Sequence, residues 1–321
     1  MAFTKVGVGV DSPSMWGYED SAFGTLATTM TNVFGNGATV NISQNNNTER
    51  LYALGSRNAQ KFVSKKYDGT WSADFALGNA YFLKAVLGTV GSETGTGPYT
   101  RTYAENNTCP SMSIANAVNL DTDSMQNVLG AKANNMTLNC NVNEVARVKL
   151  DGMFQKMTKT TTLATTTSGD SEDPLIFSGA SIKLGSTSAA DVQSIEMTVG
   201  NNMEYLFGLG SRFATKGVEK QREYSFKISE AYEDDTILLN NFLGSSTQST
   251  TSPANLTSLV ATFTNGLTST NQRTLIATFT QLQIPTYDMT FDINEILKED
   301  APLWALNCSG ISYINNSSSS P

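Results

Sequence analysis

Carboxylates are the residues of this sequence that come closest to forming a catalytic or metal-binding cluster. They stand in two groups: Asp170, Glu172 and Asp173, and Glu233, Asp234 and Asp235. The first group lies in a polar linker, and the second lies at the expected start of a helix, where acidic side chains stabilise the helix dipole. Neither group has the alternating ligands and central glycine of a calcium loop. We therefore expect no metal site in either group.

Other reactive groups are few. The sequence contains no histidine, which removes Ser-His-Asp and Cys-His arrangements, HExxH zinc sites and the commonest general base. No phosphate-binding glycine motif opens a helix. The three cysteines, Cys109, Cys140 and Cys308, lack metal or redox spacing, so we interpret them as small buried residues or free thiols. We expect no catalytic residue and no cofactor.

A repeated motif is the strongest candidate for a contact site. LYALGSRNAQK, residues 51–61, returns as LFGLGSRFATK, residues 206–216, with seven of eleven positions identical. Each motif glycine suggests a turn or bulge that a residue with a Cβ would resist. The residues singled out are Gly55, Ser56, Arg57 and Lys61 in the first copy and Gly210, Ser211, Arg212 and Lys216 in the second.

Further basic residues follow both copies: Lys65 and Lys66 in the first, Lys220 and Arg222 in the second. These basic loops are either solvated or partners for acidic residues of a neighbouring subunit. Binding of nucleic acid is disfavoured, because aromatic residues are poorly interleaved and the whole chain is acidic.

The elements around both motifs come in the same order, which predicts a long hairpin in each copy. The matching pieces are strands at 38–43 and 194–200, strands at 71–77 and 224–229, short helices at 79–88 and 234–244, and closing strands at 136–144 and 289–295. A fixed order of matching pieces at an offset near 150 indicates a duplicated unit, arranged as tandem domains. The helices are amphipathic, so we expect each to cover one face of a sheet.

These pieces divide the chain into four parts. We predict an N-terminal arm at 1–37, a first module at 38–165, a second module at 166–314 and a disordered tail at 315–321. A Thr-rich and then acidic stretch, residues 158–174, marks the boundary between the modules. The arm holds Trp16, Tyr18, Phe23 and Phe34. Such aromatic residues pack either on their own domain or on a neighbouring subunit.

Length and composition agree with this division. A chain of 321 residues corresponds to about two domains. It has 39% hydrophobic and 16% charged residues and is rich in Ser, Thr, Asn and Gly, which suits β-rich folds with many turns. It lacks a signal peptide and any apolar run near the ~20 residues of a membrane span, so we expect a soluble chain made in the cytoplasm.

The formal net charge of −8 is unevenly distributed. Residues 1–165 carry 13 Lys and Arg against 12 Asp and Glu, whereas residues 166–321 carry 8 against 17. An acidic surface argues against binding DNA by neutralising phosphates. It would suit a wall that DNA passes without adhering.

Both copies run in the same order: two asparagines, L[YF]xLGSR, a basic loop, an alternating strand and a short helix ending in Leu-Gly. This order resembles that of the tail tube proteins (major tail proteins) of long-tailed bacterial and archaeal viruses. The stretch at residues 130–154 is similar to the closing hairpin of that family, and residues 174–185 and 208–228 are similar to its other segments. The resemblance implies a mainly β fold of two tandem β-sandwich or half-barrel modules, each with a long hairpin and one short flanking helix.

The resemblance also implies a function. Six such modules form one ring, so three chains with two modules each would close a homo-oligomeric, pseudo-hexameric ring. Stacked rings form the virion tail tube, which contacts other tail proteins and lets viral DNA pass without specific binding. The two Gly-Ser-Arg hairpins would bridge subunits, with Arg57 and Arg212 paired with carboxylates; an internal salt bridge is the alternative. No membrane or cofactor is implied.

Two other classes of function stay open at the sequence level. A surface or secreted β-sandwich protein, such as an adhesin or surface-layer component, fits the Thr, Ser and Asn content but not the missing signal peptide. An enzyme would require a pair of carboxylates, for which the sequence gives no specific spacing.

Overall fold

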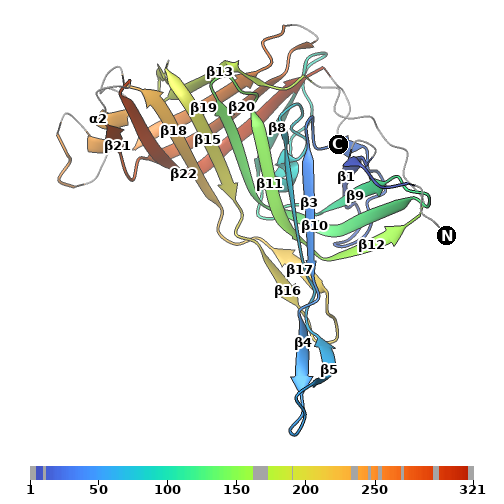
Figure 1. Ribbon diagram of the computed structural model, residues 1–321. Coiled ribbons are helices and arrows are strands. Elements are labelled where there is room, and N and C mark those ends of the chain that lie inside the picture. Colours follow the sequence, from blue (N-terminus) through green and yellow to red (C-terminus); the bar gives the residue numbers. More distant parts are fainter. Residues whose placement is uncertain are drawn as a thin grey trace.

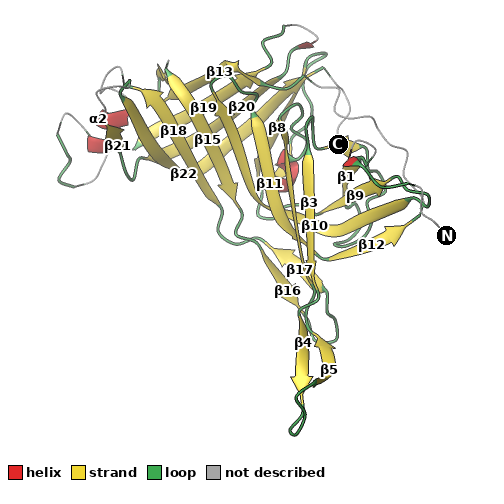
Figure 2. Cartoon of the chain, viewed as in Figure 1, coloured by secondary structure: helices red, strands yellow, loops and turns green. Residues whose placement is uncertain are grey.

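The computed structural model is mainly β, with two short helices among the residues that it describes (Figures 1 and 2). It describes residues 5–9, 12–161, 173–189, 191–232, 238–244, 247–251, 255–268, 271–291 and 296–316. The predicted mainly β class is therefore confirmed. The carboxylates Asp170, Glu172 and Glu233 to Asp235 lie outside the described residues, as do residues 317–321 of the expected tail.

One antiparallel sheet, the main sheet, runs through most of the chain (Figure 1). Its strands, in hydrogen-bonded order, are β3 (Thr39–Asn45), β6 (Asp68–Ala76), β11 (Arg147–Phe154), β10 (Ser124–Asn141), β15 (Val192–Gly200), β18 (Glu223–Ala231) and β22 (Lys298–Asn315). Residues alternate between its two faces, as the period of two in a strand requires. In β11, Val148 and Leu150 are fully buried while Lys149 is exposed.

The long strands β10 and β22 leave the main sheet and continue into a second layer. The first part of β10 pairs with β9 (Met112–Val118) and β12 (Lys156–Thr160), and β9 pairs with β1 (Ser14–Tyr18), which pairs with β2 (Asn32–Val33). The last part of β22 pairs with β20 (Thr274–Gln283) and β8 (Tyr99–Glu105), and β8 pairs with β7 (Gly88–Val90). Beyond β20 lie β19 (Leu256–Thr264), β13 (Ile176–Leu184) and β14 (Thr187–Ala189). The start of β22 also pairs with β21 (Asp288–Thr290).

A β-bridge between Val145 and Ile176 closes this network into a barrel. The neighbouring backbone strengthens the closure, because the amide of Ala146 donates to the carbonyl of Leu175 at 2.9 Å. Closure removes free strand edges from this part of the molecule.

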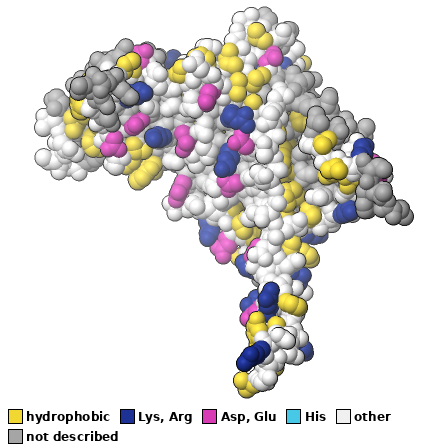
Figure 3. All heavy atoms as spheres, viewed as in Figure 1, with side chains coloured by type: hydrophobic (Ala, Val, Ile, Leu, Met, Phe, Trp, Pro, Cys, Tyr) yellow, Lys and Arg dark blue, Asp and Glu magenta, His cyan; other side chains and the backbone are white. Residues whose placement is uncertain are grey.

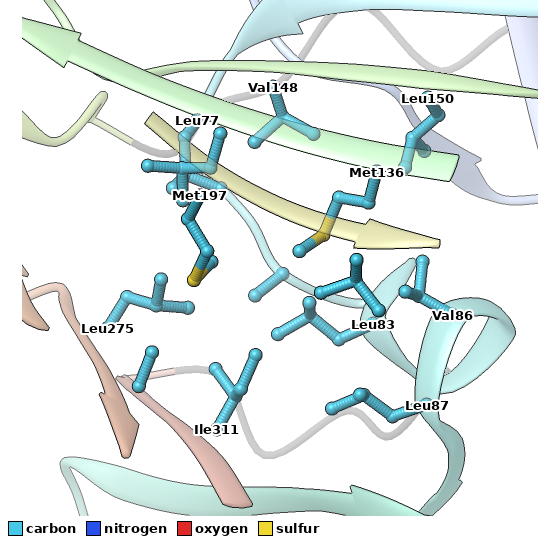
Figure 4. Close-up of a cluster of buried hydrophobic side chains, with 14 of the residues drawn as sticks. Leu77, Leu83, Val86, Leu87, Met136, Val148, Leu150, Met197, Leu275 and Ile311 are labelled. Carbon is cyan, nitrogen blue, oxygen red and sulfur yellow. The ribbon is translucent and has the colours of Figure 1, made fainter. Parts of the chain in front are cut away.

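The core lies between the main sheet and the second layer. In Figure 4, Met136 and Leu150 of the main sheet lie near Leu83 and Val86 of helix α1 (Leu83–Leu87). Fully burying one such apolar side chain contributes about 1.5–3 kcal/mol. The helix ends at Gly88, whose φ of 113° is easy only for glycine.

Both expected helices are present and short. The second, α2 (Leu238–Leu243), ends before Gly244, whose amide donates to the carbonyl of Asn240 at 2.8 Å. The predicted start of this helix at 234–237 lies outside the described residues.

The order of strand pairing in β1–β12 recurs in β13–β22, except that β7 and β8 have no counterpart among the described strands; we call these segments the first and second units. β1 pairs with β2 and β9, and β13 pairs with β14 and β19. β3–β6–β11–β10 has its counterpart in β15–β18–β22–β21. Equivalent residues of the two units are 155 positions apart in the pairings β3–β6 and β15–β18. They are 151 positions apart in the pairings β10–β11 and β21–β22.

The N-terminal segment packs on its own chain. Trp16 is fully buried in β1, and its ring lies 6.1 Å from that of Phe34. At the other end, Asn315 was expected to begin a disordered tail but is buried as the last residue of β22. Its amide donates to the hydroxyl of Tyr81 at 3.3 Å, which holds the strand to the core.

Candidate assembly and channel surface

The exposed face of the main sheet, the polar face, is formed by Ser, Thr, Asn and charged side chains. The residues in one row across the strands are Thr39, Asp74, Lys149, Thr137, Thr198 and Ser225, and the row ends at the exposed Trp304 of β22. In Figure 3, basic and acidic side chains lie side by side over these strands. The face is therefore hydrated but carries few apolar groups on which a ligand could dock.

Opposite charges are neighbours on the polar face. Lys149 lies opposite Asp74, and Glu196 lies opposite Lys227. Arg147 donates from Nε to Asp74 at 2.9 Å. Such cross-strand neighbours contribute about 0.2–1 kcal/mol each, and opposite charges placed side by side weaken the long-range field that each would produce alone. Here the face carries both signs, where the sequence suggested an acidic wall.

Two hairpins project from the same end of the main sheet (Figure 1). The first hairpin is β4 (Thr48–Tyr52) and β5 (Ala59–Ser64), and the second is β16 (Glu204–Phe207) and β17 (Ala214–Val218). The predicted contact residues lie in these hairpins, with Gly-Ser-Arg at the tips.

The tips have the same local structure. Gly55 has a φ of 83° and Gly210 a φ of 92°, and a Cβ would meet nothing within 4 Å at either position. Glycine is thus required by the backbone and not by crowding. The Ser56 hydroxyl accepts from the Asn58 amide at 3.2 Å, as Ser211 does from Phe213 at 3.1 Å.

The bases of the hairpins also match, through residues that the motif did not single out. Asn47 and Asn202 both have a φ of 47°, and each side-chain amide donates at 2.9 Å to a backbone carbonyl, of Lys66 and of Gln221. The asparagine pairs before each motif were the sequence signal, since Asn tolerates the left-handed region.

An ion pair also recurs at this position. Lys65 contacts Glu49 at 2.7 Å, and Lys220 contacts Glu204 at 2.9 Å. The hydrogen bond from Lys220 lowers the pKa of the exposed Glu204 carboxyl. All four residues are exposed, so these pairs orient the strands more than they stabilise them.

The surroundings of the two hairpins differ. The second lies against the first unit, where the Tyr205 hydroxyl donates to the carbonyl of Met153 at 2.7 Å and Gln155 donates to the carbonyl of Ala214 at 2.6 Å. Lys132 and Glu219 form a 2.6 Å ion pair there, nearly shielded from solvent. Strands β4 and β5 of the first hairpin are almost wholly exposed.

Arg212 binds at the base of the first hairpin. Its Nε donates to the carbonyl of Lys65 at 2.9 Å and its Nη2 donates to Oδ1 of Asn46 at 2.8 Å. These partners are neutral and belong to the same chain; pairing of Arg212 with a carboxylate of another subunit stays a prediction. Its counterpart in the first hairpin is Arg57, whose side chain forms no hydrogen bond or ion pair with any described residue. Lys61 and Lys216 are exposed strand residues.

The remaining candidate groups are structural. Cys109, Cys140 and Cys308 are buried free thiols. Burial raises the pKa of the Cys140 thiol to about 11 and that of Cys308 to about 12. No group of His, Cys, Asp and Glu among the described residues could hold a metal ion. Within the same residues, no helix has the length and hydropathy needed to cross a bilayer.

The fold and its surface define a structural β protein, with a broad polar sheet and projecting hairpins. The sequence profile of the family described as phage tail tube protein matches residues 11–293, and the chain belongs to that family. It is a structural component of the virion tail, which assembles with copies of itself and with other tail proteins. The chain matches no curated protein sequence.

Proposed function

We propose that the chain forms stacked rings in which the main sheets join edge to edge and line a tube for viral DNA. The observation that carries this proposal is the main sheet itself. It spans both units with one polar face, and among the described residues its two outer edges, at β3 and β21, have no pairing partner. Unpaired edges favour strand addition from another chain, and head-to-tail contacts of this kind close into rings.

The number of chains follows from the two units. Their matching pairing order supports a tandem duplication, with two tube modules in each chain. If six modules complete a ring, as the family resemblance implies, three chains form it with pseudo-sixfold symmetry. The hairpins, with Arg57 and Arg212 at their tips, would then contact adjacent subunits or rings.

Passage of DNA is supported by the chemistry of the polar face. Its hydroxyl and amide side chains are hydrated, and its charges lie in cross-strand pairs such as Glu196 with Lys227. A phosphate backbone meets no continuous basic track, which would retain it, and the exposed apolar groups Trp304 and Leu306 are confined to the β22 side of the sheet. Such a wall lets DNA slide without specific binding.

Electron microscopy of the purified protein at high concentration tests the proposal. Rings or tubes of uniform bore are the expected result, and their symmetry gives the number of chains. Monodisperse monomers at every concentration and salt condition, especially monomers that bind glycans, would favour a surface-binding protein instead.

A further inference from the structure

The junction between the two units provides a template for the contact between two chains. Residues 135–141 of β10 pair with residues 194–200 of β15, for example Leu138 with Met197. Apolar side chains from both strands share the core face of this pairing, since Leu138, Cys140, Ile195 and Met197 are all buried. The junction is thus one continuous sheet with one continuous core.

The counterparts of these two strands are both unpaired on their outer edges. β3 is equivalent to β15, because residues 155 apart occupy matching positions in the pairings β3–β6 and β15–β18. β21 is equivalent to part of β10, because residues 151 apart match in the pairings β10–β11 and β21–β22. A positive φ also recurs at the same offset, at Gly130 in β10 and at Gln281 in β20, 151 residues later.

We propose that β21 of one chain pairs antiparallel with β3 of the next in a defined register, which places Asp288 opposite Ser43 and Met289 opposite Ile42. This inference rests on the proposed ring, and it names the surfaces that form it. The register follows from the junction, where Thr137 lies opposite Thr198 and Leu138 opposite Met197. Adding 151 to the β10 residues gives 288 and 289 in β21, and subtracting 155 from the β15 residues gives 43 and 42 in β3. It puts Met289 and Ile42 on the core face and Asp288 and Ser43 on the polar face, as alternation requires.

The shape of the surface beside β3 agrees with this pairing. A groove of about 910 Å³, lined in part by Phe34, Val40 and Ile42, lies beside the open edge of β3. The equivalent space beside β15 holds only about 70 Å³, where Cys140 of the first unit forms part of its lining. Phe291, the counterpart of Cys140, is 76% exposed. In the proposed contact Phe291 enters the groove opposite Val40.

The first hairpin completes the contact. In the unit junction the second hairpin covers Met153 and Gln155, whose counterparts 151 residues later are Trp304 and Leu306. Both are apolar and exposed, at 59% and 73%. The first hairpin of the next chain carries exposed Leu51, Tyr52, Phe62 and Val63. Large exposed apolar groups mark interaction surfaces, and this arrangement brings the two sets together.

Disulfide trapping tests the register. The variant with Ser43→Cys and Asp288→Cys, assembled and mildly oxidised, is expected to convert most chains into disulfide-linked oligomers on non-reducing gels. β3 and β21 lie at opposite ends of the main sheet (Figure 1), so such a bond must join two chains. The matched positive control is Thr137→Cys with Thr198→Cys, whose hydroxyls lie 3.4 Å apart in one chain.

A register control uses Asn41→Cys with Asp288→Cys, which places the cysteines two residues out of register, at about 7–8 Å, beyond the usual reach of a disulfide. This variant should give little cross-linking. Rings that form without the Ser43–Asp288 bond, while the positive control does cross-link, would overturn the register and leave the tube role standing. Failure of the parent chain to assemble at all would overturn both.

Discussion

Replacing Phe291 by alanine should weaken assembly without weakening the fold. The ring is 76% exposed in the single chain, so its truncation removes little that stabilises the monomer, and such surface changes usually alter the free energy of unfolding by less than about 0.5 kcal/mol. In the proposed contact, on the order of 150 Å² of the side chain becomes buried. At about 25 cal/mol per Å² this gives an upper limit of about 3–4 kcal/mol per contact.

Alanine keeps the Cβ, so we expect a loss of about 2–3 kcal/mol, equivalent to roughly a 30- to 150-fold weaker association per contact. Sedimentation velocity over a concentration series measures the threshold for assembly, and thermal unfolding checks the monomer. Leu267→Ala is the control, because Leu267 is also exposed, at 45%, but lies outside the proposed contact. Equal thresholds for Phe291→Ala and Leu267→Ala would refute the reasoning.

Three further predictions concern the hairpins and the thiols. Gly210→Ala forces a residue with a side chain to adopt a φ of 92°. It should lower the free energy of unfolding, measured in urea, by about 1–2 kcal/mol. Gly208→Ala is the control and should cost less, because its Cβ would meet Thr215 at an ordinary 3.5 Å. Arg57→Glu should impair ring formation without changing the melting temperature. Arg212→Glu should impair ring formation and also lower the melting temperature, because it loses hydrogen bonds within the chain. Identical behaviour of the two variants would contradict this prediction. The Cys308 thiol, whose pKa is raised to about 12, should resist alkylation at pH 8 until the chain unfolds. Because the folded state holds this proton more tightly than the unfolded state, stability should fall as pH rises from about 9 toward 12, and a flat profile would argue against it.

The local structure of the hairpins could be predicted from the sequence, because turns depend on residues close together in the chain. Glycine at 55 and 210 and asparagine before each motif impose their backbone angles wherever the hairpin lies. The alternation of Val148 and Leu150 with Lys149 likewise identified the buried face of a strand.

Long-range pairing could not be read in this way. Sequence similarity aligns Met136 with Met289, but the strand pairing aligns Leu138 with Met289. Leu138 lies opposite Val148 and Met289 lies opposite Glu299, the residue equivalent to Val148. Register depends on the strands across the sheet, and those are distant in sequence. The neutral partners of Arg212 were missed for the same reason: Asn46 is 166 residues away.

The joining of β10 to β15 within a single polypeptide has a kinetic consequence. Tethered partners meet at an effective concentration of the order of millimolar, so this seam is complete as soon as the chain folds. The proposed circle of six units would then need three contacts between separate chains instead of six. In the proposed ring, linking the units in tandem would also let alternate positions around the bore carry different surfaces, which identical separate units could not do.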